Sequence, residues 1–146
     1  LCFSEAELAD AVRENLGQVG AFQKVKEAVV VQEYLQGDEF VVNTVSLQGH
    51  HRVLDMWRAE KVVDGSRIYY GHQLLVLDST EHADVVRFCL EALDALGMAG
   101  GTAHLEVVRT EAGVRLIEIN ARNAGHMPRA TRQLGENQVS ALVGAL

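Results

Sequence analysis

The stretch GTAHLEVVRTEAGVRLIEINAR, residues 101–122, carries two acidic side chains within segments that otherwise have the composition of buried β-strands. Glu106 and Glu118 each lie among Leu, Val and Ile, on either side of a predicted loop that ends in Gly113. A three-residue hairpin loop commonly ends in a glycine with a left-handed backbone conformation. With Gly113 in that role, the strand pairing places Glu106 directly opposite Glu118.

The same register predicts which residues share a face with this acidic pair. It pairs three further sets of residues across the hairpin: Thr110 with Val114, His104 with Asn120, and Thr102 with Arg122. Because side chains alternate between the faces of a strand, four residues are predicted to lie on the side of the two acids: His104, Asn120, Thr102 and Arg122. The aliphatic residues are predicted to point to the opposite face: Ala103, Leu105, Val107, Ile117 and Ile119.

Two opposed carboxylates are chemically suited to holding a cation. Directly opposed residues have Cβ atoms about 5 Å apart, and like charges at that position destabilise the sheet. Either one carboxyl pKa rises or a cation lies between the two groups. With the amide oxygen of Asn120 the donors are hard oxygens, which suit Mg²⁺ or Mn²⁺. The alternative, a polar sheet face that is simply solvated, stays open from the hairpin alone.

The elements that position the hairpin are predicted from apolar spacing and capping residues. Ser4 with Glu7 fits a capping box that opens a helix ending near Leu16. An amphipathic helix is predicted from Ser79 or Thr80 to Leu96. Strands are predicted over 28–35, 39–47, 52–62 and 67–77, and a loop over 121–129 leads to a helical C-terminus. This pattern predicts an α+β fold, an antiparallel sheet with flanking helices.

Composition excludes several classes of protein. The chain has 146 residues, about one domain's length, and a formal net charge of −7, which argues against a nucleic-acid surface. Cys2 and Cys89 lack metal-ligand spacing and indicate a reducing compartment, so a cytoplasmic location is predicted. No run approaches the roughly 18 apolar residues of a membrane span. Because the sequence opens with Leu1 rather than Met, it is predicted to be part of a longer chain.

Polar residues outside the hairpin are candidates for nucleotide contacts. Backbone groups of Glu33 and Leu35 are placed to meet an adenine, and Glu39 to accept ribose hydroxyl protons. Lys61 is a candidate to face phosphates. The alternatives are a solvated Glu39 and a Lys61 paired with a neighbouring acid, Glu60 or Asp55.

Two other groups of basic residues are candidates for metal or anion binding. His50 and His51 are adjacent and so point to opposite faces of a strand, which favours loop histidines over a metal pair. Arg122, Arg129 and Arg132 follow the two acids, and guanidinium groups suit planar carboxylate or phosphate recognition.

Three blocks, in order, resemble the ATP-grasp superfamily, specifically its carboxylate–amine ligases of the L-amino acid and dapdiamide type. The blocks are QEYLQGDEFVVNTVSLQGHHRVLDMWRAEK, GTAHLEVV and LIEINAR. The resemblance implies that Glu106 and Glu118 hold two Mg²⁺ ions with ATP and that Asn120 completes one ion's shell. It further implies that Arg122 steadies an acyl phosphate and a tetrahedral intermediate, and that His104 helps to orient the reacting groups.

The remaining roles implied by the resemblance concern the nucleotide and the substrates. Gln32, Glu33 and Leu35 would line the adenine pocket, Glu39 would bind ribose, and Lys61 would approach the phosphates. His126 and Arg129 look like residues of a substrate loop, for carboxylate and amine substrates that include amino acids.

The resemblance also implies a division of the chain and a reaction. Residues 1–36 resemble the end of the first ATP-grasp subdomain with its hinge strand, and residues 37–146 resemble the metal-binding catalytic subdomain. The implied enzyme is an ATP-dependent ligase that forms an amide through an acyl phosphate. Since no glycine-rich hairpin with a triphosphate-binding lysine precedes Leu1, we expect a fragment that is inactive alone and that pairs as a homodimer. Alternatives are a non-catalytic nucleotide-binding or assembly module and a carboxylase-type ATP-grasp enzyme.

Overall fold

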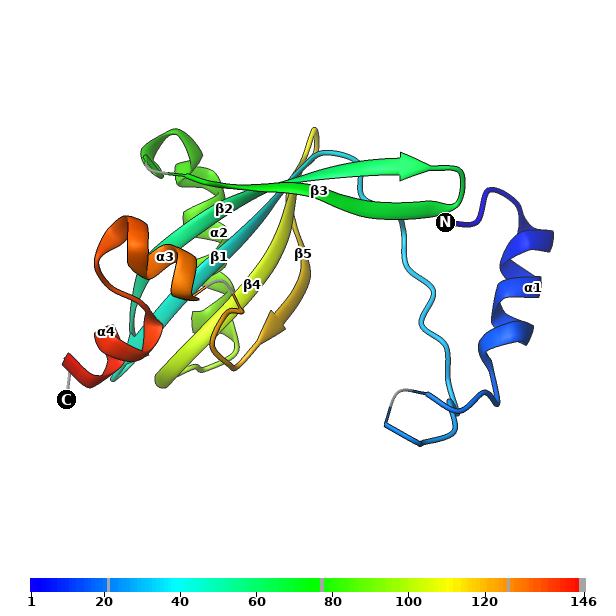
Figure 1. Ribbon diagram of the computed structural model, residues 1–146, viewed down its shortest axis with the longest axis horizontal. Coiled ribbons are helices and arrows are strands. Elements are labelled where there is room, and N and C mark those ends of the chain that lie inside the picture. Colours follow the sequence, from blue (N-terminus) through cyan, green and yellow to red (C-terminus); the bar gives the residue numbers. More distant parts are fainter. Residues whose placement is uncertain (21, 77, 126, 145–146) are drawn as a thin grey trace. The chain divides into compact units, whose positions relative to one another are not determined.

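A computed structural model describes residues 1–20, 22–76, 78–125 and 127–144, without the side chains of residues 72, 74 and 127–130. The chain divides into two compact units (Figure 1). Unit 1 comprises Leu1–Tyr34 with Val62–Tyr69, and unit 2 comprises Leu35–Lys61 with Tyr70–Leu146. Each unit is described by itself.

A five-stranded sheet carries the polar residues of interest. Its strands are β3 (Arg67–Leu75), β2 (His50–Asp64), β1 (Asp38–Leu47), β4 (Gly100–Thr110) and β5 (Gly113–Asn120), in that spatial order. Strand β1 pairs antiparallel with both β2 and β4, and β4 pairs antiparallel with β5. The predicted antiparallel sheet with flanking helices is therefore confirmed.

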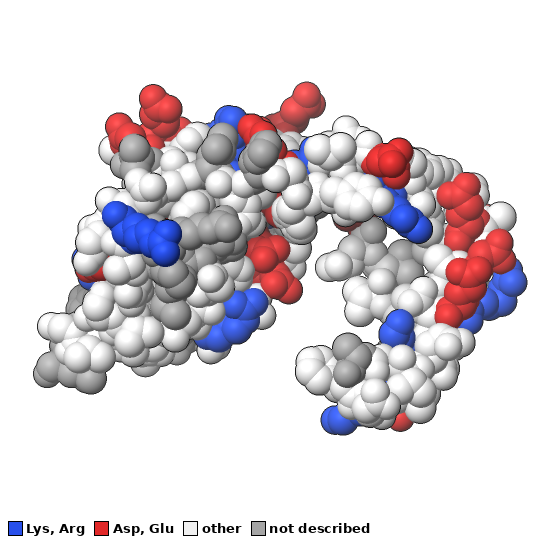
Figure 2. Space-filling view, viewed as in Figure 1, with Lys and Arg blue, Asp and Glu red and all other residues white. Residues whose placement is uncertain are grey.

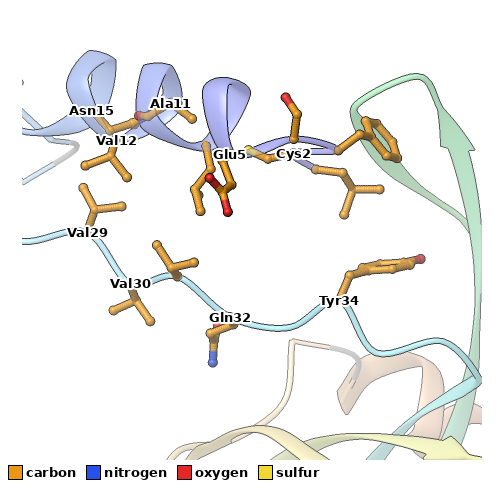
Figure 3. A pocket seen from close by; sticks show the side chains of 14 residues that line it. Cys2, Glu5, Ala11, Val12, Asn15, Val29, Val30, Gln32 and Tyr34 are labelled. Carbon is orange, nitrogen blue, oxygen red and sulfur yellow. The ribbon is translucent and has the colours of Figure 1, made fainter.

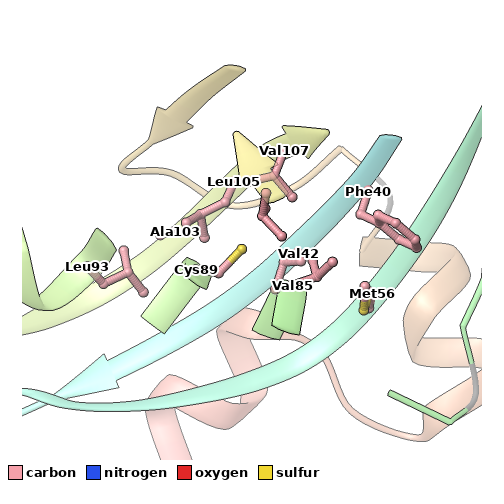
Figure 4. Close-up of a cluster of buried hydrophobic side chains, with 10 residues drawn as sticks. Phe40, Val42, Met56, Val85, Cys89, Leu93, Ala103, Leu105 and Val107 are labelled. Carbon is pink, nitrogen blue, oxygen red and sulfur yellow. The ribbon is translucent and has the colours of Figure 1, made fainter. Parts of the chain in front are cut away.

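One face of the sheet packs against a helix and forms the core of unit 2. A short 3₁₀ turn, η1 (Thr80–His82), leads into α2 (Ala83–Ala95), close to the predicted helix. Apolar residues four apart line one stripe of α2, and they meet the aliphatic side chains of β1, β2, β4 and β5 in the core (Figure 4). This core contains Phe40, Val42, Met56, Val85, Cys89, Leu93, Ala103, Leu105, Val107 and Val114. Burial raises the pKa of the Cys89 thiol to about 12, so it remains protonated.

Two short helices follow the hairpin, and α4 is attached to the sheet. They are α3 (Met127–Leu134) and α4 (Gln138–Gly144); α3 begins inside the stretch predicted as a loop. The buried side-chain amide of Gln138 donates to the carbonyl oxygens of Thr44 (3.0 Å) and Ala103 (2.8 Å). Its oxygen accepts from the N–H of Ala124 (2.7 Å), so one side chain attaches the segment after β5 to two strands. No helix among the described residues is long and apolar enough to cross a membrane.

The β1–β2 connection corrects one prediction. Gln48 and Gly49 both have positive φ angles, 52° and 78°, as a two-residue type I′ hairpin turn requires. His50 and His51 consequently lie in β2, and their prediction as loop histidines is wrong. The imidazole of His51 is buried and its Nδ1 lies 2.7 Å from the hydroxyl oxygen of Ser46.

Unit 1 contains helix α1 (Glu5–Asn15), which is capped as predicted. The Ser4 hydroxyl accepts from the N–H of Glu7 (3.2 Å), while the Glu7 carboxylate accepts from the N–H of Phe3 (2.8 Å). The strand predicted over 28–35 is wrong, because these residues form no strand and none of them is buried. A strand needs a neighbour to satisfy its backbone groups, and the described residues place none beside this run.

Candidate functional site

The hairpin β4–β5 brings together the two acids as predicted. Glu106 pairs directly with Glu118, and His104 pairs with Asn120. Directly opposed residues of an antiparallel pair project to the same face. The central geometric prediction is therefore confirmed.

The route to that register differs from the predicted one. The loop has two residues, since Thr110 pairs with Gly113 rather than with Val114. A β-bulge then restores the register: Leu116 lies opposite Val107, the next pair is Glu118 with Glu106, and Ile117 is the extra residue. The shorter loop and the bulge shift the register by one residue in opposite directions. The predicted pairing of Thr102 with Arg122 is wrong, because β5 ends at Asn120.

The two sides of β4 behave as alternation predicts. Ala103, Leu105 and Val107 are fully buried in the core against α2. His104 and Glu106 point to the opposite face, which is not covered by α2. Ile119 packs against the core as predicted, whereas Ile117 occupies the bulge.

A row of polar side chains crosses the sheet on the Glu106 face. Asn43 of β1 is in register with Asp55 of β2 on one side and with His104 of β4 on the other. The amide nitrogen of Asn43 donates to Asp55 Oδ1, and His104 Nδ1 lies 2.8 Å from the amide oxygen of Asn43. His104 Nε2 lies 3.1 Å from Glu106 Oε1. Neither Asn43 nor Asp55 was identified from the sequence, because each reads singly as an ordinary polar residue of a strand.

The surroundings of Glu106 keep its carboxyl group ionised. The pKa of Glu106 is lowered mainly by the hydrogen bond to His104, which outweighs the opposing effect of partial burial. Electrostatic interactions with His104, Lys61 and Arg122 lower the pKa of Glu106 in the same direction as the hydrogen bond. Its partner Glu118 is exposed and accepts from the Asn120 side-chain amide at 2.6 Å.

A second acidic group lies on β1, beside the first. Glu39 is only 3% exposed, and its carboxylate is paired with the ammonium group of Lys61. The Lys61 nitrogen also lies 5.5 Å from the centroid of the Tyr70 ring, within range of a cation–π interaction. Glu39 is therefore not a solvated residue, and Lys61 pairs with it rather than with Glu60 or Asp55.

Tyr70 lies beside Glu39 and Lys61, and the sequence did not predict it as a site residue. Partial burial and the negative charges of Glu39, Glu106 and Glu118 raise its pKa to about 12, so the phenol stays neutral. The phenol of Tyr70 is thus affected by the pair Glu106–Glu118 as well as by Glu39. The strand 67–77 was predicted, but tyrosine is common in strands, so its type alone carried no signal.

The other predicted contacts, with adenine and with the substrates, are not tested by the structure. Gln32 and Glu33 are exposed in unit 1, and Leu35 is half-buried at the start of unit 2. His126 lies outside the described residues, and Arg129 lies in α3 without a described side chain. Arg122 is exposed, and its guanidinium group donates to the carbonyl oxygen of Asn123 at 3.1 Å.

The donor set fits a hard divalent cation that takes part of its ligands from a substrate. Glu106, Glu118 and Asn120 offer oxygen atoms from one face of one hairpin. Within the described ranges, no three His, Cys, Asp or Glu side chains gather closely enough to hold a metal by themselves. Mg²⁺ is commonly held by one or two carboxylates plus phosphates. The Lys and Arg side chains visible in Figure 2 form small separate patches among acidic ones.

Comparisons with known proteins agree with this geometry. Residues 3–130 match the family of ATP-grasp domains. The chain is 32% identical, over 149 aligned residues, to dapdiamide A synthase from Enterobacter agglomerans, covering 100% of the chain and 35% of that protein.

Two solved structures are similar in fold. The L-amino acid ligase from Bacillus licheniformis is similar over 96% of the chain and 34% of its own, with a TM-score of 0.73 and 22% identity. D-alanine–D-alanine ligase from Bacillus anthracis, complexed with ATP, is similar over 98% of the chain and 48% of its own, with a TM-score of 0.65 and 14% identity. The chain thus spans about a third of the length of the synthase and of the L-amino acid ligase.

Proposed function

The chain belongs to the ATP-grasp domain family, and from that premise we propose that the complete protein is an ATP-dependent carboxylate–amine ligase. The relatives that support this are a synthase and two ligases, two of them named for amino-acid substrates. We propose that the acid and the amine are likewise small molecules of the amino-acid class. Because the chain spans about a third of these relatives, the activity is assigned to the complete protein.

The observation that carries the proposal is the opposition of Glu106 and Glu118 on an open sheet face. Like charges directly opposite one another destabilise a sheet, so the pair is costly unless a cation is bound there. A module that only assembled with other proteins would have no physical need for this arrangement. The proximity of Lys61, Glu39 and Tyr70 to the same face supports a site for a polar ligand.

The reaction needs a carboxylate to be made electrophilic. The terminal phosphoryl group of ATP passes to the substrate carboxylate, so that a P–O bond to ADP breaks and an acyl phosphate forms. The amine then attacks the acyl carbon, loses a proton, and phosphate leaves. Catalysis of such steps consists mainly of positioning and of stabilising developing charge.

Each residue of the site has a proposed part in this positioning. Glu106, Glu118 and Asn120 would hold Mg²⁺, or Mn²⁺, which when bound supplies positive charge to the phosphates. Glu39 would bind ribose hydroxyl groups once Lys61, on its flexible stem, turns towards the phosphates. The exposed guanidinium of Arg122 would stabilise the tetrahedral oxyanion.

The remaining assignments concern the adenine, the reacting groups and the substrates. Gln32, Glu33 and Leu35 would meet the adenine, His104 would help to orient the reacting groups, and His126 and Arg129 would contact the amino-acid substrates. We further propose that the chain is inactive alone. Homodimerisation stays a prediction, and a monomeric mass by light scattering would contradict it.

Substitution of one acid tests the function. In the complete protein, Glu118→Gln removes one charge from an exposed side chain and is expected to lower Mg²⁺-dependent phosphate release by at least about 100-fold, the scale of one lost electrostatic contact. The thermal midpoint of unfolding is expected not to fall, because the substitution removes a like charge opposite Glu106. The measurement is phosphate release across a panel of amino-acid pairs, with mass spectrometry of the amide product.

The matched control is Glu111→Gln, at the exposed tip of the same hairpin, which is expected to keep wild-type turnover. Undiminished turnover by Glu118→Gln would remove the assigned role of the acidic pair. A wild-type protein that releases no phosphate with any amino-acid pair would refute the ligase.

A further inference from the structure

Four neighbouring polar side chains on the Glu106 face of the sheet are buried. Asn43, Asp55, Trp57 and His104 are 0%, 6%, 4% and 5% exposed, respectively. Burying polar groups is costly unless their hydrogen bonds are made, and a partly satisfied network is worse than an apolar core. Three strands contribute to this polar network, and its outer end is the contact between His104 and Glu106.

The chemistry of the groups determines the direction of each hydrogen bond. The Asp55 carboxylate can only accept, and its Oδ1 receives both the indole N–H of Trp57 and the amide N–H of Asn43. The amide oxygen of Asn43 therefore faces His104, and Nδ1 of the ring must donate to it. The Glu106 carboxylate can only accept, so the contact of Nε2 with Glu106 Oε1 is a hydrogen bond when Nε2 also carries a proton.

Two irregularities of the sheet lie beside this network. The β1–β2 register shifts between Asn43 and Thr44, next to the network, and the β4–β5 register shifts between Glu106 and Val107, next to the acid. Bulges re-aim side chains and are common next to active sites. The polar row thus lies between two register shifts of the sheet, one beside Asn43 and one beside Glu106.

We propose that Asn43 and Asp55 are positioning residues, which act through His104 to hold the Glu106 carboxylate in the orientation that binds the divalent cation. The inference rests on the proposed function of Glu106 as a metal ligand. Residues hydrogen-bonded behind a metal ligand commonly change metal affinity by 10–100-fold when they are replaced. Among the described contacts, Asn43 and Asp55 reach Glu106 through His104, so their effect on metal binding measures this coupling.

A donor–acceptor exchange tests the coupling. Asp55→Asn keeps the shape of the side chain but lets its own amide donate, so that Asn43 no longer has to present its oxygen to His104. The double variant Asn43→Asp/Asp55→Asn restores the complementarity. A carboxylate at position 43 accepts from His104 Nδ1 and from the amide at position 55, whose oxygen still accepts from Trp57.

The measurement is binding of Mn²⁺ with a non-hydrolysable ATP analogue to the complete protein, followed by electron paramagnetic resonance. Asp55→Asn is expected to weaken Mn²⁺ binding by about 10-fold, and the double variant to regain most of that affinity. The control Thr44→Val lies next to the network, is equally buried, and removes a hydroxyl that has no hydrogen-bond partner among the described residues. It is expected to bind Mn²⁺ as the wild type does.

A second readout needs neither metal nor turnover. In the metal-free wild type, a slowly exchanging His104 Nδ1–H resonance is expected in ¹H–¹⁵N spectra. Asn43→Leu, which removes the acceptor at similar volume, is expected to abolish it.

The proposal is overturned if folded Asp55→Asn binds Mn²⁺ as tightly as the wild type, if the folded double variant does not regain affinity, or if the Nδ1–H is unprotected in the wild type. Failure of the proposed function has a different signature. There, the wild type would bind Mn²⁺ and the analogue, and the variants would still differ, but no amide would form.

Discussion

The two units contain similar apolar runs but treat them in opposite ways. In unit 2, Val42 of β1 is fully buried, whereas in unit 1 Val30, in an equally apolar run, is 80% exposed. No described residue of unit 1 is buried, although apolar side chains line a hollow of about 620 Å³ between α1 and residues 29–34 (Figure 3). The difference shows that an apolar run becomes core only where another surface covers it.

The largest expected effect is a loss of folding stability on truncating an apolar side chain in unit 2 but not in unit 1. In the chain of 146 residues, Leu105→Ala is expected to lower the free energy of unfolding by about 2–5 kcal/mol, because it leaves a cavity in a well-packed site. The truncation Val30→Ala in unit 1 is expected to change the free energy of unfolding by less than about 0.5 kcal/mol, as at other surface positions. The measurement is urea-induced unfolding followed by circular dichroism. Equal losses from both substitutions would break the comparison.

A smaller effect concerns the local stability of unit 1. Ser4→Ala removes the acceptor that caps α1 and is expected to destabilise that helix by about 1 kcal/mol. The core of unit 2 does not depend on this cap, so hydrogen exchange is expected to accelerate in α1 but not in α2. Ser4→Asp, which keeps an acceptor, is the control and is expected to retain protection. Equal acceleration in both helices would show that the units are energetically coupled.

The smallest expected effect is the pH dependence of the stability that the Glu106 carboxylate contributes. Because the pKa of Glu106 is lower in the folded state than in the unfolded chain, its ionised form contributes stability that is fully present above the ordinary glutamate pKa. That contribution is lost as the pH falls through the lowered value. The difference in urea midpoint between the wild type and Glu106→Gln is therefore expected to shrink from neutral to acid pH. A constant difference would indicate that His104 does not stabilise the carboxylate.

Much of the fold was predictable because its signals are local. The cap of α1, the apolar spacing of α2, the turn glycines and the alternation along β4 each depend on neighbours in the sequence, and the elements lie close to the predicted positions. The wrong predictions have non-local causes. The run 28–35 looks like a strand, but a strand exists only with a partner, and His50 joined β2 because the turn used Gln48 and Gly49.

For the candidate site, the sequence by itself determined the residue types, and the predicted pairing of Glu106 with Glu118 is observed because a bulge offsets the shorter loop. Only the tertiary structure decided what surrounds them: the bulge at Ile117, the salt bridge of Lys61 with Glu39, and the row from Asp55 to His104. These contacts join strands whose order in the sheet cannot be predicted from local sequence patterns. A side chain's chemistry is local, whereas its partners and its burial depend on which strands lie side by side.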